Sequence, residues 1–292
     1  MAKSSKFIFI LAIFITIVTA FSAHSWMQSE HHNDRAIQRS KIDPVIFVPG
    51  SSASVNRFDD LFATINAKER GKNVHSVLKV LVKEDGTLSY SGHLSSENRR
   101  PFIVVGFERN QDNYPTIKAD GESLSKVMTS LQKKYYFRNF SAVGHSNGGL
   151  IWTHYLENYY NSTNFHIKTL MTLGSPFNFS ETSTTKRTTM LTDMINNSDN
   201  LPSDLVVYSV AGSEDYTDDG IVPVQSVLSG KYVFQKSVAK YTQTTVSGEN
   251  AQHSNLPENP DVVNLINELI LNNSRDKRPT LDRSQQSSTG NN

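Results

Sequence analysis

The sequence has 292 residues, 37% of them hydrophobic and 20% charged, with a formal net charge of +1 at pH 7. We expect no nucleic-acid partner, because phosphate binding needs a concentrated positive surface and this sequence has no comparable basic run. It contains no cysteine, which excludes disulfides, thiolate metal sites and a cysteine nucleophile. The length suits one large α/β domain or two small ones.

The first residues have the pattern of an export signal. Lys3 and Lys6 precede an apolar run over residues 7–21, and small residues and then a polar stretch follow. An uncleaved anchor is the alternative, although the apolar run is shorter than the roughly 20 residues that cross a bilayer. Residues 1–25 are therefore predicted to be a signal peptide or an N-terminal membrane anchor. We expect the protein to be secreted, or anchored through this segment at the outer face of the cytoplasmic membrane.

Two polar stretches flank the rest of the chain. Residues 26–42 are polar and without period, which predicts a linker. Residues 274–292 are rich in Ser, Arg, Asp, Gln and Asn, which predicts a disordered tail. The folded domain is therefore expected over residues 43–273, a length that suits one domain.

Within this domain, short apolar runs alternate with helical patterns. In the first half we predict, in chain order, a strand over 45–48, a helix over 57–70, strands over 74–82 and 87–90 joined by a turn at 84–86, a strand over 102–107 and a helix over 120–136. The second half predicts a strand over 140–143, a helix over 148–159, strands over 168–173, 205–210, 232–234 and 238–246, and a helix over 262–271. This alternation favours a mostly parallel sheet with helices on both faces.

The strongest functional signal is the segment Gly144-His-Ser-Asn-Gly148, which fits G-x-S-x-G between a predicted strand and a predicted helix. Such a segment makes a sharp turn with the serine at its tip, and its glycines let strand and helix approach closely. The helix that follows directs its N-terminal dipole toward the charge that develops in acyl transfer. Ser146 is therefore the predicted nucleophile.

A serine nucleophile needs a general base, and in this arrangement the acid and then the histidine follow it in the chain. Three histidines follow Ser146 within the expected domain. His154 lies inside the next helix, and His166 stands at the start of a strand, at the edge opposite the strand carboxyl ends. His253 lies in a polar loop between the last predicted strand and the last helix, where a catalytic histidine is expected. We predict His253 as the base.

The acid is expected in the loop after the strand at 205–210. This loop holds four carboxylates, Glu214, Asp215, Asp218 and Asp219. We favour Asp219, because the following Gly-Ile-Val-Pro makes a tight turn that would hold its carboxylate at the rim of the sheet. Asp215 is the second choice and Asp218 the third. A calcium site is the minority interpretation of the four acids, since no further ligands are in view.

Two backbone N–H groups form the predicted oxyanion hole. Asn147, the residue after the nucleophile, supplies one of them. The loop that closes the strand at 45–48 is the natural source of the other, and Ser51 is our choice within it. The alternative for Ser51 is an ordinary turn at the end of a strand.

Residues 177–197 follow the strand at 168–173 and combine a Ser/Thr-rich run with later apolar residues. They predict either a small cap over the site, whose apolar residues would line an acyl pocket, or a plain surface helix.

The motifs together resemble those of exported, lipase-like α/β hydrolases of Gram-positive bacteria, often labelled cell-surface hydrolases. The resemblance covers most of residues 43–273 and rests on five segments, which are PVIFVPGSSA at 44–53, RFD at 57–59, GHSNGG at 144–149, DGIVP at 219–223 and HSNL at 253–256. It implies the α/β-hydrolase fold, with Ser146 as nucleophile, Asp219 as acid and His253 as base. Pro49 and Asn147 depart from the residues common in lipases of this kind, which leaves the substrate open.

These observations predict a serine hydrolase that cleaves carboxylic esters, of a small molecule or a lipid, through an acyl-enzyme. An acyltransferase that uses the same residues is one alternative, and a surface binding protein with a vestigial triad is the other. The sequence has no G-x-G-x-x-G, P-loop or H-E-x-x-H pattern, so we expect no cofactor and no metal.

Overall fold

The computed structural model describes residues 14–22, 42–69, 74–95, 98–183, 185–248 and 250–272. Residues 14–22, within the predicted signal or anchor, form a helix. Among the described helices, none is long and apolar enough to cross a membrane. The rest of the predicted signal or anchor, nearly all of the predicted linker over 26–42 and the predicted tail over 274–292 lie outside the described residues.

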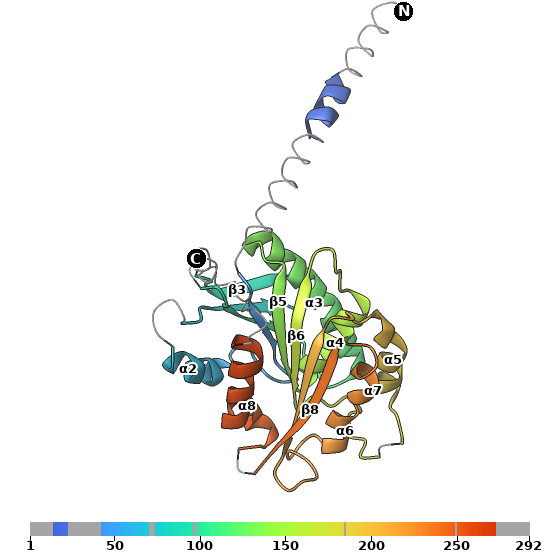
Figure 1. Ribbon diagram of the computed structural model, residues 1–292. Coiled ribbons are helices and arrows are strands. Elements are labelled where there is room, and N and C mark those ends of the chain that lie inside the picture. Colours follow the sequence, from blue (N-terminus) through green and yellow to red (C-terminus); the bar gives the residue numbers. More distant parts are fainter. Residues whose placement is uncertain are drawn as a thin grey trace, which may run out of the picture.

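An eight-stranded sheet runs through the centre of the domain (Figure 1). The strands are β1 Val45–Val48, β2 Val77–Val82, β3 Leu88–Gly92, β4 Phe102–Phe107, β5 Asn139–His145, β6 His166–Leu173, β7 Val206–Ser213 and β8 Lys240–Ser247. They lie in the order β3-β2-β4-β1-β5-β6-β7-β8, and every neighbouring pair is parallel except β2 and β3. The carboxyl ends of the parallel strands therefore share one edge, where the loops after them gather.

Helices cover both faces of this sheet, with α2 and α8 on one side and α3, α4 and α5 on the other (Figure 1). The helices are α2 Asp59–Ala67, α3 Tyr114–Tyr135, α4 Asn147–Asn158, α5 Thr189–Asn197, α6 Val224–Leu228, α7 Lys231–Phe234 and α8 Pro260–Ile266, which continues as a π-helical turn over Asn267–Leu271. Short 3₁₀ helices lie at Ser198–Asn200 and His253–Glu258. Successive β1 side chains alternate between two cores, with Ile46 in one and Phe47 in the other.

The predicted architecture, a mostly parallel sheet with helices on both faces, is confirmed. The predicted hairpin is present as well, and Gly86 in its turn has a positive φ of 81°. The predicted helix over 120–136 begins earlier, at Tyr114, because the Asn113 side chain accepts the Thr116 N–H and Pro115 suits the first turn.

One predicted strand is wrong. Residues 232–234 belong to the short helix α7 and not to a strand. Three consecutive apolar residues carry no periodicity that separates a strand from a buried helical turn. Packing decides the matter, because the Phe234 ring lies 5.4 Å from the Phe177 ring and 5.8 Å from the Tyr241 ring, centroid to centroid.

The apolar residues of α5, which lies within segment 177–197, face the core. Met190, Leu191 and Met194 on α5 are buried in the same core as α3 and α4. The helix α5 therefore corresponds to the surface-helix alternative.

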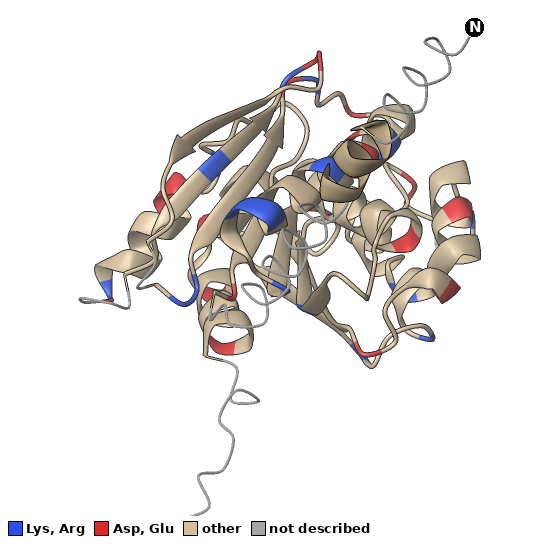
Figure 2. Cartoon of the chain, turned by 90° about the horizontal axis from the view of Figure 1, so that it is seen from above, with Lys and Arg blue, Asp and Glu red and all other residues tan. Residues whose placement is uncertain are grey.

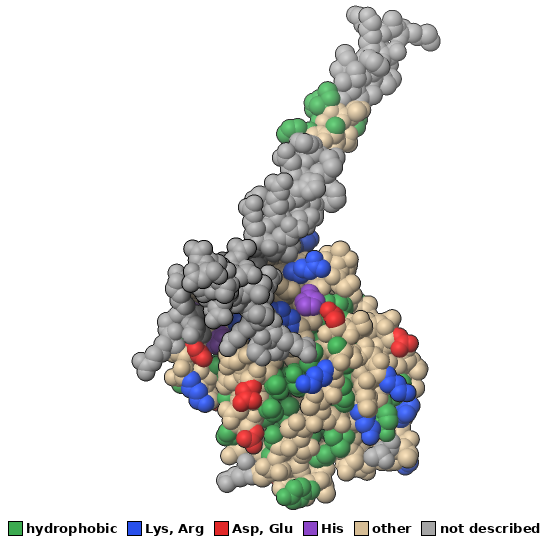
Figure 3. All heavy atoms as spheres, viewed as in Figure 1, with side chains coloured by type: hydrophobic (Ala, Val, Ile, Leu, Met, Phe, Trp, Pro, Cys, Tyr) green, Lys and Arg blue, Asp and Glu red, His purple; other side chains and the backbone are tan. Residues whose placement is uncertain are grey.

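Charged side chains of both signs are interspersed over the surface. In the view from above, Lys and Arg are scattered among Asp and Glu over helices and loops (Figure 2). The face seen in Figure 3 likewise carries both signs, with apolar side chains between them. On the face that Figure 3 shows, a charged ligand therefore meets single charged side chains among the described residues and no continuous patch of one sign.

Candidate active site

The predicted nucleophile stands at a strained turn between β5 and α4. Ser146 has φ 54° and ψ −129°, a conformation that residues other than glycine keep only where the surrounding structure holds them. A β-carbon on Gly144 would lie 2.4 Å from the Gly149 nitrogen, and one on Gly148 would lie 2.0 Å from the Val48 oxygen. The glycines of the motif are therefore required by the close packing of β1, β5 and α4 around the turn.

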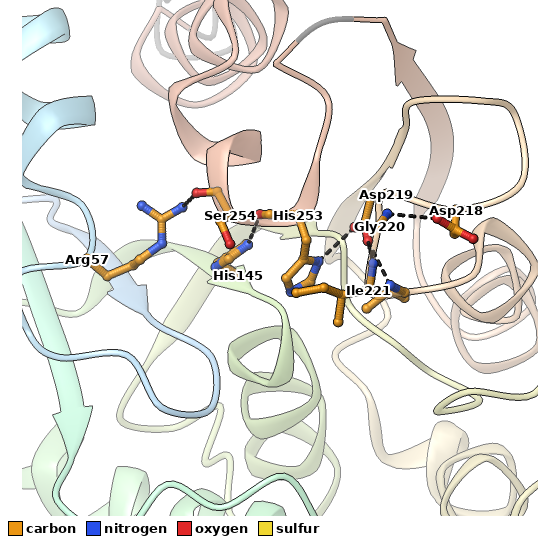
Figure 4. A network of polar contacts seen from close by, with 9 residues as sticks. Arg57, His145, Asp218, Asp219, Gly220, Ile221, His253 and Ser254 are labelled. Carbon is orange, nitrogen blue, oxygen red and sulfur yellow. Dashed lines mark hydrogen bonds and ion pairs between the residues drawn. The ribbon is translucent and has the colours of Figure 1, made fainter.

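Asp219 and His253 form a buried, hydrogen-bonded pair (Figure 4). Asp219 Oδ2 lies 2.7 Å from His253 Nδ1, and the His253 N–H donates to the Asp219 carbonyl oxygen at 2.7 Å. The other carboxylate oxygen, Oδ1, accepts the N–H groups of Ile221 at 3.1 Å and of Val222 at 2.7 Å. Asp219 is 1% exposed. With Nδ1 engaged by the carboxylate, His253 has Nε2 left for a proton transfer.

The other aspartates of this loop serve the turn itself. Asp215 Oδ1 accepts the N–H of Thr217 at 3.0 Å and its hydroxyl at 2.6 Å, and Asp218 Oδ1 accepts the Gly220 N–H at 2.8 Å. Both side chains are engaged on their own loop, whereas Asp219 turns inward to His253. Within the described ranges, no group of three or more His, Asp or Glu side chains is arranged to hold a metal ion.

The other two histidines that follow Ser146 lie where the sequence predicts them. His154 is buried inside α4, and its Nδ1 lies 3.0 Å from Asn158 Nδ2. His166 begins β6, at the opposite edge of the sheet from the gathered loops, and contacts Asp204 at 3.0 Å. Only His253 among these three lines the pocket that contains Ser146.

The two predicted oxyanion donors are Ser51, in the loop after β1, and Asn147, the residue after Ser146. The loop after β1 passes directly against the nucleophile, since a β-carbon on Gly50 would lie 2.5 Å from the Ser146 β-carbon. Within the described part of the chain, neither the Ser51 N–H nor the Asn147 N–H donates to another backbone or side-chain group. Both donors are thus available to a ligand.

A pocket of about 1000 Å³ joins these groups, and Ser51, Ser146, Asn147 and His253 all line it. The loops after β6 and β7 contribute apolar side chains, which are Pro176, Phe179, Ile221 and Val222. The loops after β1 and β4 contribute mostly polar ones, which are Ser51, Ser52, Arg57, Asp112 and Asn113. Of the described residues in segment 177–197, only Phe179 and Ser180 line the pocket.

Two further residues, His145 and Arg57, hold the backbone of the His253 loop (Figure 4). His145 Nε2 lies 2.9 Å from the His253 carbonyl oxygen, and Arg57 donates to the Ser254 carbonyl oxygen and pairs with Glu258 at 2.8 Å. Burial, reinforced by the neighbouring His253 and Arg57, holds the pKa of His145 well below its ordinary value. His145 is therefore neutral and donates through Nε2. Both residues stand in the quoted motifs, but the sequence assigned neither of them a role.

The comparisons with known proteins confirm the predicted α/β-hydrolase fold. The profile of a family described as "Alpha/beta hydrolase of unknown function (DUF915)" matches residues 32–273. A predicted cell surface hydrolase of Lactobacillus plantarum WCFS1 is 46% identical, with a TM-score of 0.73 over 80% of this chain and 92% of that one. The lin2722 product of Listeria innocua is 28% identical, with a TM-score of 0.69 over 77% and 92%. No curated protein matches the sequence.

Proposed function

The chain belongs to the DUF915 family of α/β hydrolases, and from this premise we propose that it is a serine hydrolase that cleaves carboxylic esters. One observation carries the proposal: the buried Asp219–His253 hydrogen bond of 2.7 Å opens onto the same pocket as Ser146 at its strained turn. A nucleophile, a base and an orienting acid in this chain order are what acyl transfer through an acyl-enzyme needs.

In the proposed reaction, His253 Nε2 takes the Ser146 hydroxyl proton while Oγ attacks the ester carbonyl carbon. The N–H groups of Ser51 and Asn147 hold the oxyanion, aided by the N-terminal dipole of α4. His253 then returns the proton to the departing alcohol, and water, activated by the same imidazole, releases the acyl group. Asp219 keeps the Nδ1 proton in place throughout.

No hydrogen bond joins the Ser146 and His253 side chains among the described residues. In sites without substrate, such catalytic contacts are often long, and they tighten when substrate binds.

Turnover of p-nitrophenyl esters by the full-length chain tests the proposal. We expect hydrolysis of the acetate and butyrate, with kcat/KM falling for longer acyl chains, because Phe179 and Ser180 are the only described residues of segment 177–197 that line the pocket. A fluorophosphonate probe should label Ser146, as peptide mass spectrometry would detect. A protein that neither hydrolyses these esters nor reacts with the probe would contradict the proposal and favour a binding protein. Product analysis with competing alcohols separates hydrolysis from acyl transfer.

We extend the proposal to the compartment. Export of the enzyme, or its retention at the outer face of the cytoplasmic membrane, is supported by the charged and apolar pattern of residues 1–25. It is also supported by the Lactobacillus plantarum relative, which is described as a surface protein.

A positioning role for His145 gives a separate prediction. Replacing His145 with Ala removes the donor to the His253 carbonyl oxygen and is expected to lower kcat about tenfold with little change in KM. His145→Gln keeps an N–H donor and should retain most of the activity. Since the His145 pKa is held low by burial, the pH profile of the Gln variant should keep its shape. An Ala variant with wild-type kcat would show that the contact is dispensable.

A further inference from the structure

The pocket holds one carboxylate that the proposed mechanism does not use. Asp112 lies in the loop between β4 and α3, is exposed and lines the pocket. Its Oδ1 accepts a hydrogen bond from Asn147 Nδ2 at 2.8 Å, which holds the carboxylate beside the residue that supplies a proposed oxyanion donor. No Lys, Arg or His of the described residues forms an ion pair with Asp112.

The other charged groups of the pocket do not offset this charge. Arg57 is already paired with Glu258 at 2.8 Å and donates to the Ser254 carbonyl oxygen. His145 is buried and neutral. The nearest lysine in the sequence, Lys118, lies over the ring of the pocket residue Tyr114, 4.6 Å from its centroid, and forms no ion pair with Asp112. A ligand entering the pocket therefore meets a carboxylate that no ion pair neutralises among the described residues, and a cleft focuses such a charge.

For an uncharged ester, the position of the Asp112 carboxylate is unfavourable for the proposed reaction. A negative charge develops on the carbonyl oxygen close to Asn147, and a fixed carboxylate hydrogen-bonded to the same residue opposes it. A neutral asparagine at position 112 would hold Asn147 equally well through its own carbonyl oxygen. The hydrogen bond to Asn147 therefore explains why an acceptor stands at position 112. It does not explain why that acceptor is negatively charged.

We infer that Asp112 recognises a cationic group on the substrate, so that the enzyme acts on esters that carry an ammonium or alkylammonium group. This inference rests on the proposed function and names the substrate class of the same site. The cation is attracted by the exposed carboxylate oxygen, and its charge offsets the repulsion between Asp112 and the oxyanion.

Matched pairs of neutral and cationic esters of the same shape test the inference. Acetylcholine and 3,3-dimethylbutyl acetate place the difference in the alcohol, and ethyl 4-aminobutanoate and ethyl pentanoate place it in the acyl group. We expect the full-length protein to favour the cationic member of at least one pair by about fivefold in kcat/KM, and less at high salt. Asp112→Asn keeps the acceptor for Asn147 and should abolish the preference, because kcat/KM for the cationic esters falls to the level of the neutral ones.

Asp60→Asn is the matched control, because Asp60 is an exposed aspartate on α2 outside the pocket and its loss changes the net charge equally. It should keep the preference. Equal rates on both members of each pair, or an equal loss on both in Asp112→Asn, would overturn the inference. If neutral esters are hydrolysed in a Ser146-dependent manner without this preference, only the inference fails. If no ester of either pair is hydrolysed, the proposed function fails.

Discussion

Ser146→Ala is expected to lower kcat for ester hydrolysis by roughly 10⁵- to 10⁶-fold, because no acyl-enzyme can form without the hydroxyl. Asp219 and His253 should stay in place, because Ser146 takes no part in the hydrogen bonds that hold them. Ester binding, measured as KM or as competition with a non-hydrolysed analogue, should change little. The measurement is initial-rate kinetics with p-nitrophenyl butyrate, together with loss of fluorophosphonate labelling.

Ser146→Gly separates the chemistry from the fold. Glycine adopts φ 54° without the strain that serine bears at this turn, so this variant should be as inactive as the alanine variant yet more stable, by about 1–2 kcal/mol. Urea unfolding of the wild-type, Ala and Gly proteins measures the difference. Wild-type turnover in either variant would exclude Ser146 as the nucleophile.

Asp219→Asn is expected to lower kcat by about 10⁴-fold. The reason lies in the two backbone donors on Oδ1: the N–H groups of Ile221 and Val222 hold the amide oxygen of the new asparagine in that place. Its NH₂ group then faces His253 Nδ1, which has to become an acceptor, and the ring proton moves to Nε2. An imidazole protonated at Nε2 cannot take the proton from Ser146.

The neighbouring Asp218 provides the control for this substitution. In Asp218→Asn the amide oxygen can still accept the Gly220 N–H, so the turn is kept and activity should stay within about twofold of wild type. Both variants should unfold at similar temperatures. If Asp219→Asn retained most of its activity while Asp218→Asn lost it, the assignment of the acid would be reversed.

The local parts of the fold could be predicted because their causes are local. The alternation of apolar runs and helical patterns indicated a parallel sheet, and the hairpin followed from a turn with glycine at its third residue. The segment at 232–234 failed because three apolar residues suit a strand and a helical turn equally, and contacts with Phe177 and Tyr241 decided between them.

The candidate site divides in the same way. The pattern around Ser146 sets a backbone turn within a few residues, and the chain order limited the histidine to His253. The sequence separated the four acids of one loop less clearly, because their sequence surroundings are similar. The structure separates them by direction: Asp215 and Asp218 accept hydrogen bonds within three residues of themselves, while Asp219 reaches His253, 34 positions away.

The sequence by itself determined the fold class, the strained turn at Ser146 and the order of the groups around it, because each depends on periodicity or on contacts between near neighbours. Only the tertiary structure decided which aspartate turns inward, that His145 holds the His253 carbonyl oxygen 108 residues away, and that Asp112 lies against Asn147, 35 residues away. Hydrogen bonds over such separations depend on how β4, β5 and the last loops meet at the edge of the sheet. No pattern of neighbouring residues in the sequence encodes this arrangement.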